Sequence, residues 1–128
     1  MICLDTNYLV RGLVKRAKES AELTEWYQSG EVLLSAAPAW YEFLCGPITG
    51  PQISAIRAFL SGGISAFEEV QATEAARLFN ATGRIRRLRV DAMIAATAIV
   101  ASARLATSNT EDFRPFLPHG LKLVRQAK

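Results

Sequence analysis

The sequence predicts an α/β fold, a short parallel sheet of about five strands with helices on both faces. Two observations support this fold class. The apolar runs are short and continuous, which is typical of strands buried on both faces of a sheet. They alternate along the chain with longer segments of helical spacing, as in a sheet with crossover helices. With 128 residues, the chain has the length of one domain, so we expect a single domain over residues 1–128.

The first half of the chain is expected to hold two strands and three helices. Ser29-Gly30 stops the first helix. The next two begin at Ala37-Pro38 and Gly50-Pro51, where a proline near the first turn leaves no hydrogen bond unmade. In order, the expected elements are a strand over residues 1–4, a helix over 8–28, a strand over 32–35 and helices over 37–45 and 50–61.

The second half continues the alternation of short apolar runs and helical segments. Gly83 ends one helix, and the next is rich in alanine, so it can pack closely on a sheet. In order, the expected elements are a strand over 64–67, a helix over 72–80, a helix over 90–103, a strand over 105–106, a loop over 107–115 and a last strand over 121–124.

Composition excludes several classes of protein. Half of the residues are apolar and 21% are charged, as in ordinary globular proteins. No apolar run approaches the roughly 20 residues that span a bilayer, and Asp5 and Arg11 interrupt the N-terminus too early for a signal peptide. We therefore expect a cytoplasmic protein without a membrane partner.

Cys3 and Cys45 are expected to be buried free thiols, and a single histidine, His119, leaves no zinc-type ligand spacing.

Arginine is concentrated in one short segment. The net charge is only +3, but eleven of the fifteen basic residues are arginine. Four of them fall within six positions, at Arg84, Arg86, Arg87 and Arg89. The forked guanidinium group is suited to phosphate, so we expect this cluster to bind the backbone of a nucleic acid. A solvated connection between two helices would explain the same cluster.

The first carboxylate of interest follows the first strand. Asp5 ends an apolar run and precedes Thr6-Asn7, where a helix begins. Open α/β sheets place their ligands and their chemistry at this edge, beyond the C-terminal ends of the strands. Asp5 could equally be only the N-cap of the helix, which stabilises a helix by roughly 1 kcal/mol.

Glu42 is the only charged residue between Glu31 and Arg57, and its neighbours are large and apolar. A carboxylate that is buried without a partner destabilises the fold or becomes protonated. Glu42 therefore either faces solvent alone on an apolar helix or meets a cation.

Two further acids occur where a sheet would bring them close to Asp5. Asp91 begins the alanine-rich helix, where an acid is also favourable for the helix dipole alone. Asp112 lies with Thr107 and Asn109 in a segment that follows a predicted strand, so its side chains lie at the same edge of the sheet. A segment rich in Thr, Ser, Asn and Asp is also typical of a simple turn.

These positions converge at one edge of the predicted sheet. Clustered carboxylates raise each other's pKa unless a cation is present. Oxygen ligands without His or Cys favour Mg²⁺ or Mn²⁺, and such ions, when they hold a phosphodiester, activate water and stabilise the leaving oxygen. The sequence thus predicts a site for a divalent metal ion where these acids meet.

Four short blocks along the chain resemble the signature of a known family. They are Leu4-Asp5-Thr6-Asn7, Glu42 followed by Gly46, Asp91 with Ile94-Ala95-Ala96 and Ala98, and Thr107 with Asn109 and Asp112-Phe113. In this order they resemble the blocks of PIN-domain ribonucleases, specifically the VapC-like toxins of bacterial and archaeal toxin–antitoxin pairs. The resemblance implies a compact parallel sheet between helices and an endoribonuclease that depends on Mg²⁺ or Mn²⁺.

The resemblance also implies roles for residues. The three core acids of the family fall on Asp5, Glu42 and Asp91, which would bind the metal ion. Many members carry an aspartate where this chain has Asn109, so either Asp112 supplies the fourth carboxylate or the site has only three. Asn109 and Asp112 are expected to assist at the metal ion through water or a weaker ligand bond. The expected supporting residues are Thr6, Asn7 and Thr107, the two threonines through their hydroxyl groups.

Two protein partners are expected. An antitoxin would dock in an apolar groove on the N-terminal helices and reach the acidic pocket with a basic side chain, because these helices carry more large apolar residues than a core of this size needs. The residues expected to form the groove are Val10, Leu13, Trp26, Trp40 and Phe43. The same surface could serve a homodimer, which the resemblance also implies.

Two alternatives remain open. Phosphoryl transfer through an aspartyl nucleophile at Asp5 would require a second aspartate two residues later and a lysine in the site, but Asn7 stands at that position and no lysine lies near a motif. A catalytically impaired PIN-like module that only binds RNA or protein would explain the neutral Asn109. Such a module would show no stabilisation by a divalent ion.

Overall fold

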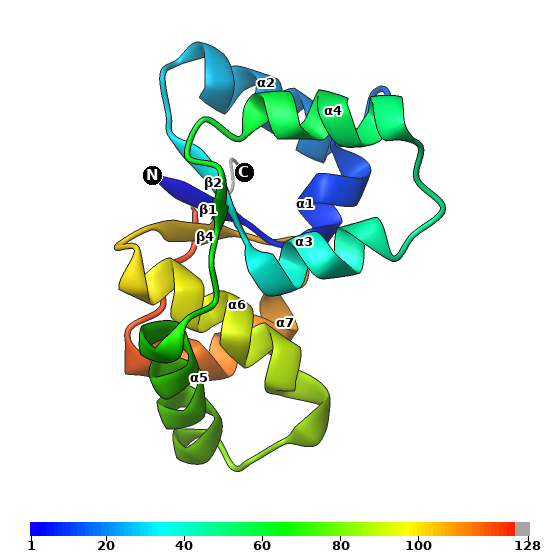
Figure 1. Ribbon diagram of the computed structural model, residues 1–128. Helices are drawn as coiled ribbons and strands as arrows, with labels where there is room; N and C mark the ends of the chain where they lie inside the picture. Colours follow the sequence, from blue (N-terminus) through cyan, green and yellow to red (C-terminus); the bar gives the residue numbers. More distant parts are fainter. Residues whose placement is uncertain (125–128) are drawn as a thin grey trace.

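A four-stranded parallel sheet lies at the centre of the computed structural model, which describes residues 1–124 (Figure 1). Its strands lie in the order β3-β2-β1-β4. They are β1 (Ile2–Leu4), β2 (Leu33–Ala36), β3 (Ile64–Ser65) and β4 (Arg104–Ala106). Leu4 is level with Ser35 of β2 and with Ala106 of β4. The carboxyl ends of these three strands therefore meet at one edge, together with the residues that follow them.

Helices cover both faces of the sheet, so the predicted α/β fold is confirmed. Figure 1 shows α1, α2 and α4 on one side and α5 and α6 on the other. The helices of the described residues are α1 (Thr6–Arg11), α2 (Lys18–Gln28), α3 (Ala37–Leu44), α4 (Gly50–Phe59), α5 (Glu69–Ala81), α6 (Arg89–Val100) and α7 (Thr110–Phe113), with 3₁₀ segments over Arg86–Leu88 and Arg114–His119.

The alanine-rich helix α6 packs between α5 and the sheet. Its buried residues are Ala92, Ile94, Ala95, Ala96, Thr97 and Ala98. A helix covered on two sides is apolar around much of its surface, and small side chains allow it to approach its neighbours closely. This packing holds the first turn of α6, which contains Asp91, beside Asp5 at the carboxyl edge of the sheet.

The single helix predicted over residues 8–28 is wrong. α1 ends at Arg11 and α2 begins at Lys18, and the turn between them holds Arg16 at a φ of +68°. Gly12 follows α1 and lies so close to α2 that a Cβ there would be 2.5 Å from Leu23 Cδ1. Two short helices that pack against each other bury more apolar surface than one long helix, and this tertiary contact overrides the local periodicity.

Two predictions for the C-terminal part also differ from the structure. The loop predicted over residues 107–115 contains α7. The strand predicted over 121–124 is reduced to a single bridge between Leu105 and Leu123, so the sheet of the described residues has four strands rather than five. Both differences depend on contacts made after the sheet has formed, which the local sequence pattern does not contain.

The two cysteines lie in different environments. Cys3 is buried in β1, and burial raises the pKa of its thiol to about 12. Cys45 follows the last turn of α3 and is exposed, so its predicted burial is wrong. Its apolar sequence neighbours Phe43 and Leu44 point in different directions, since Phe43 is buried and Leu44 is exposed.

The remaining boundaries move by a few residues. α5 begins at Glu69 rather than at residue 72, because Glu68 and Gln71 form a capping box before the predicted start. β3 is shorter than predicted.

The expected domain end at residue 128 lies outside the described residues. Within residues 1–124, no helix has the length and apolar character needed to cross a membrane.

Candidate functional site

Asp5 lies at the carboxyl end of β1 and is also the N-cap of α1. Its buried carboxylate accepts hydrogen bonds from the Thr6 backbone N–H (2.8 Å), the Thr107 hydroxyl (2.8 Å) and the Asn7 amide (3.2 Å). The pKa of Asp5 is raised overall. Burial is the largest cause, and the nearby Glu42 charge also raises the pKa, whereas the hydrogen bonds from Thr107, Thr6 and Asn7 lower it. The helix-cap interpretation and the site interpretation of Asp5 are therefore compatible.

Glu42 projects from the exposed face of α3 toward the end of β1. The Thr6 hydroxyl donates a 2.7 Å hydrogen bond to Glu42 Oε1, and within residues 1–124 no cation pairs with this carboxylate. Glu42 is thus neither buried alone nor paired with a basic side chain. It faces a cavity, where it adds negative charge near Asp5 and Asp91.

Asp91 has the clearest electrostatic perturbation of the three core acids. Its pKa rises from an ordinary 3.8 to about 7, first because of burial and then because of the charges of Asp5, Asp112 and Glu42. Arg87 acts in the opposite direction. A half-buried carboxyl group surrounded by other acids is stabilised by protonation or by a cation.

The segment after β4 completes the edge. The buried Thr107 hydroxyl donates to Asp5 and accepts from the Asn109 backbone N–H at 2.9 Å. The Asn109 amide donates to Asp112 Oδ2 at 2.8 Å, and Arg87 donates to Asp112 Oδ1 at 2.7 Å. The Arg87 hydrogen bond is the main cause of a lowered pKa at Asp112, ahead of the Asn109 bond. Asp112 is thus held ionised, with both oxygens already accepting hydrogen bonds.

One cavity of about 410 Å³ joins these elements. It is lined by Asp5, Thr6, Asn7, Val10, Arg11, Glu42, Asp91 and Asn109. The structure therefore brings together the three predicted core acids, Thr6, Asn7 and Asn109, while Thr107 supports the cavity through Asp5. Asp112 is not part of the lining and acts on Asp91 from nearby.

The cavity lining suits a hard divalent cation. Its donor groups are carboxylate, amide and hydroxyl oxygens, which Mg²⁺ and Mn²⁺ prefer. The raised pKa values of Asp5 and Asp91 also identify a place where positive charge would relieve repulsion. Among the described residues, no three His, Cys, Asp or Glu side chains are already placed closely enough to hold an ion together. The acids would therefore have to move closer together around the cation.

The arginine cluster connects α5 to α6 and is exposed, as the solvated-connection interpretation expects. Of its four members, Arg87 reaches the acids, through Asp112. Arg84 donates to Asn80, and Arg89 donates to the Arg86 carbonyl oxygen, so these side chains bond to their own segment. The cluster lies beside the acidic edge without lining the cavity.

Three residues at this edge were not predicted from the sequence. Arg11 lines the cavity and lies four residues after Asn7 in α1. Residues four apart share one face of a helix, so the assignment of α1 would have placed Arg11 beside Asn7. Glu19 and Ser108 lie behind Arg11: Glu19 accepts from Arg11 Nε at 3.0 Å and from the Ser108 hydroxyl at 2.6 Å. Nothing in the local sequence distinguishes Glu19 from the other acids of α2.

The expected apolar groove is only partly correct. Trp40 and Phe43 are buried and belong to the core, and Trp26 stacks on Tyr8 with ring centroids 5.6 Å apart. Val10 is exposed and lines the acidic cavity. The exposed apolar side chains of these N-terminal helices include Val10, Val14, Tyr27, Tyr41 and Leu44. They belong to α1, the turn after it, α2 and α3.

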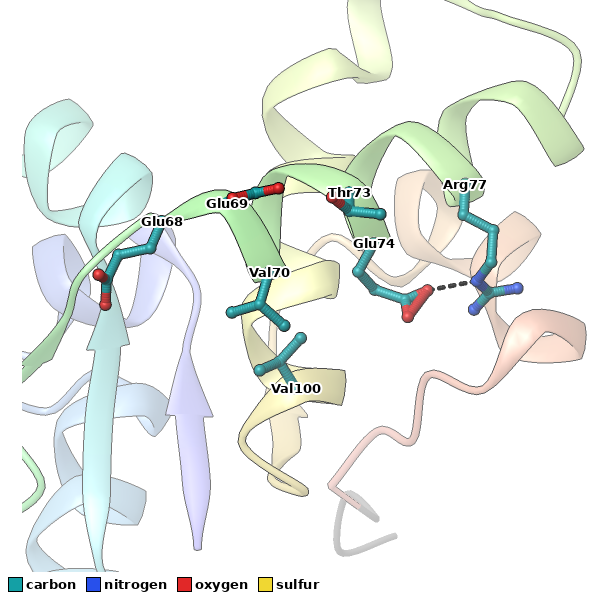
Figure 2. Close-up of a pocket in the computed structure, with 7 residues that line it drawn as sticks. All are labelled: Glu68, Glu69, Val70, Thr73, Glu74, Arg77 and Val100. Atoms are coloured by element: carbon teal, nitrogen blue, oxygen red, sulfur yellow. Dashed lines mark hydrogen bonds and ion pairs between the residues drawn. The ribbon is translucent and has the colours of Figure 1, made fainter.

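A larger cavity of about 650 Å³ lies elsewhere, along α5 and the end of α6 (Figure 2). Figure 2 shows Val70 and Val100 facing each other there, beside the ion pair of Arg77 with Glu74. None of the predicted site residues lines it. The smaller cavity holds the clustered acids, so we assign the candidate site to the smaller one.

Comparisons with known proteins agree with this architecture. The family model of the PIN domain matches residues 2–115. A toxin–antitoxin complex from Klebsiella pneumoniae contains a chain with 25% sequence identity and a TM-score of 0.70, over 88% of this chain and 90% of that one. FitAcB from Neisseria gonorrhoeae has 22% identity and a TM-score of 0.72, over 98% and 97% of the two chains.

VapBC2 from Rickettsia felis, bound to a DNA fragment from their promoter, has 22% identity and a TM-score of 0.72, over 99% of this chain and 100% of that one. A search of curated proteins gave no match. The likeness to VapC-like toxins that the sequence suggests is confirmed in the fold. Since the PIN model covers the sheet, the acidic cavity and the segment after β4, the chain belongs to the PIN domain family.

Proposed function

We propose that the chain is a metal-dependent endoribonuclease, the toxin of a toxin–antitoxin pair. The observation that carries this proposal is the convergence of Asp5, Glu42 and Asp91 on one cavity at the carboxyl edge of the sheet. The Glu42 charge contributes to the raised pKa of Asp5, and the charges of Asp5, Asp112 and Glu42 contribute to the raised pKa of Asp91, so the cavity favours a cation. Membership in the PIN family, whose general activity is nucleic-acid hydrolysis, supports the same function.

Each site residue has a role in this proposal. Asp5, Glu42 and Asp91 would hold Mg²⁺ or Mn²⁺, which when bound supplies an activated water molecule and positive charge for the leaving oxygen. Thr6 orients the Glu42 carboxylate by its hydroxyl hydrogen bond. The Thr107 hydroxyl and the Asn7 amide orient the Asp5 carboxylate by the hydrogen bonds that they donate to it. Residues that fix the direction of a ligand in this manner raise metal affinity and activity.

Asn109 and Asp112 would assist the three core acids rather than complete a quartet. Asn109 lines the cavity with a neutral amide, which binds a cation more weakly than a carboxylate. Asp112 accepts from Arg87 and Asn109, so its oxygens would have to leave these partners to bind an ion directly. We propose that Asp112 acts through water or through its charge on Asp91.

The substrate would be single-stranded or looped RNA. Arg84, Arg86, Arg87 and Arg89 would contact its backbone, since the exposed cluster lies next to the acidic edge. The proposal also retains a cytoplasmic location and one domain over residues 1–128.

An antitoxin partner is proposed because a solved structure with this fold, from Klebsiella pneumoniae, is described as a toxin–antitoxin complex. Val10 offers exposed apolar surface at the acidic cavity, and Val14, Tyr41 and Leu44 are further exposed apolar side chains of the turn after α1 and of α3. A basic side chain of the antitoxin could then enter the cavity and displace the cation. A homodimer is also part of the proposal.

A catalytically impaired PIN-like module is the second candidate, because Asn109 is neutral. Incubation of the purified chain with end-labelled RNA distinguishes the two. An endoribonuclease cleaves the RNA in Mg²⁺ or Mn²⁺ and stops in EDTA, and the Glu42→Gln variant is inactive. A chain that binds RNA without cleaving it, and whose melting temperature no divalent ion changes, is the impaired module.

Co-expression tests the partner. A small protein encoded directly upstream should co-purify with the chain and remove its ribonuclease activity. If the chain is harmless to its host and shows no such partner, the toxin half of the proposal is wrong while the nuclease half still stands.

A further inference from the structure

Arg11 differs from the other arginines of the acidic edge in what its guanidinium contacts. Within the described part of the chain it is the one basic residue that lines the cavity of Asp5, Glu42 and Asp91. Its Nε donates to Glu19, and neither of its terminal nitrogens donates to any residue between 1 and 124. Arg87, by contrast, uses a terminal nitrogen on Asp112. The forked end of Arg11 is therefore available at the cavity.

Glu19 holds Arg11 in this position from behind. The Glu19 side chain is only 8% exposed, whereas that of Arg11 is 51% exposed, so the anchor is buried and the head of the arginine faces solvent. The Ser108 hydroxyl donates to the second Glu19 oxygen at 2.6 Å and is the main cause of the lowered pKa of Glu19, which therefore stays ionised. A buried, charged anchor limits the orientations of the guanidinium and directs its free nitrogens outward.

The same anchor is connected to the core acids. The Ser108 backbone N–H donates to Asn7 Oδ1 at 3.2 Å, and the Asn7 amide donates to Asp5. Glu19 thus links α2, the segment after β4 and α1 in one hydrogen-bonded network. Within residues 1–124 Arg11 forms no hydrogen bond or ion pair with the three core acids, although it lines the same cavity. Its terminal nitrogens can therefore contact a group that enters the cavity.

We propose that Arg11 is a phosphate-binding residue of the acidic cavity, which Glu19 and Ser108 position for a bidentate contact with the nucleic-acid backbone. This inference rests on the proposed nuclease function. A guanidinium fork matches two non-bridging oxygens of a phosphate, and a cation at the cavity mouth offsets the repulsion between the substrate and the carboxylates. Arg11 binds the substrate, and Glu19 is its positioning residue.

Binding of a fluorescein-labelled single-stranded RNA, measured by anisotropy in EDTA at several salt concentrations, tests the proposal. All variants carry Asp91→Asn, so cleavage does not interfere. Arg11→Gln should weaken binding roughly tenfold, the loss of one charged hydrogen-bonded contact. It should also reduce the slope of log K against log salt by about 0.7, the value for one phosphate on a single strand. Arg11→Lys should keep the slope and bind more weakly than the parent.

Arg104→Gln is the matched control. Arg104 is similarly exposed and also pairs with a glutamate, Glu31 at 3.2 Å, but it lies at the amino end of β4, away from the cavity. This variant should bind RNA like the parent with an unchanged slope. Thermal unfolding of each variant checks the fold, and Arg11→Lys decides the result if Arg11→Gln does not fold.

Glu19→Gln tests the positioning role. It should weaken binding severalfold without changing the salt slope, because the Arg11 charge remains. Added to Arg11→Gln, it should weaken binding no further, since the two residues act through one contact. Fully additive effects would remove Glu19 from the proposal.

The outcomes separate this inference from the proposed function. If the parent binds RNA and the wild-type chain cleaves it, but Arg11→Gln behaves like Arg104→Gln, the inference about Arg11 is overturned and the nuclease proposal stands. If neither binding nor cleavage of RNA occurs with the parent and wild-type chains, both are overturned.

Discussion

Replacing Asp91 by asparagine should stabilise the metal-free protein while it abolishes cleavage. Asparagine has nearly the same shape as aspartate but no charge. In the absence of a metal ion, the Asp91 charge is opposed by burial and by Asp5, Asp112 and Glu42. Its removal relieves this repulsion, although the same substitution takes away a proposed metal ligand.

The size of the gain follows from the pKa. A rise from 3.8 to about 7 is a shift of about three units, which corresponds to an upper limit of about 4 kcal/mol at 1.36 kcal/mol per unit. Asp91 is only half-buried, so solvent screening reduces this value, and we expect about 1–2 kcal/mol. For a domain of this size, such a change raises the melting temperature by about 3–8 °C.

The gain depends on pH with a defined sign. An unfolded chain releases the Asp91 proton near pH 3.8, and the folded protein keeps it to about pH 7. Between these values the folded state binds more protons, so the free energy of unfolding decreases as the pH rises. The difference between Asp91→Asn and the wild type should therefore be largest above pH 7 and should disappear as the pH falls toward 4.

Denaturant unfolding in EDTA, followed by circular dichroism at several pH values, measures this difference. Glu31→Gln is the control of opposite sign, because the N-terminal ammonium group, ahead of Arg104, lowers the pKa of Glu31. That variant should gain no stability at neutral pH. If Asp91→Asn is less stable than the wild type at pH 8, or if its gain is the same at pH 4 and pH 8, the electrostatic account of the cavity is wrong.

Three further predictions concern single substitutions. Glu42→Gln should abolish cleavage and leave the fold intact, since the exposed side chain keeps its shape and an oxygen for the Thr6 hydroxyl; near wild-type cleavage of labelled RNA would remove Glu42 from the site. Asn109→Asp should keep or increase activity and tighten Mn²⁺ binding, because it adds a carboxylate to the cavity; a lower calorimetric affinity would place residue 109 outside the metal site. Gly12→Ala should destabilise the fold by about 1–3 kcal/mol in urea unfolding, because its Cβ would lie 2.5 Å from buried Leu23, whereas Gly50→Ala, with nothing within 4 Å, should not.

Local signals in the sequence were sufficient for the frame of the protein and for singling out its three core acids, of which two could also be placed at the ends of elements. Asp5 follows a continuous apolar run and precedes Thr6, so both the end of β1 and the N-cap of α1 are contained in neighbouring residues. Asp91 occupies the first turn of the alanine-rich α6. Strand burial, helix spacing and capping act over a few residues, so a single sequence contains the information that specifies them.

Packing between distant segments determined the rest. The Thr107 hydroxyl meets Asp5 across 102 residues of sequence, and the Thr6 hydroxyl meets Glu42 across 36. The close contact of Gly12 with α2 separated two helices that have the periodicity of one. That Trp40 is buried while Val10 is exposed follows from which face of each helix meets the sheet.

The network of Arg11, Glu19 and Ser108 also depends on packing between distant segments, and it is the least predictable part of the site from the sequence. Its three residues come from α1, α2 and the segment after β4, and no motif connects them in the sequence. Local sequence patterns specify which acids stand at the ends of strands and in the first turns of helices. Which groups those acids face depends on long-range packing, because burial, charge and hydrogen-bond partners exist only after the helices have packed against the sheet.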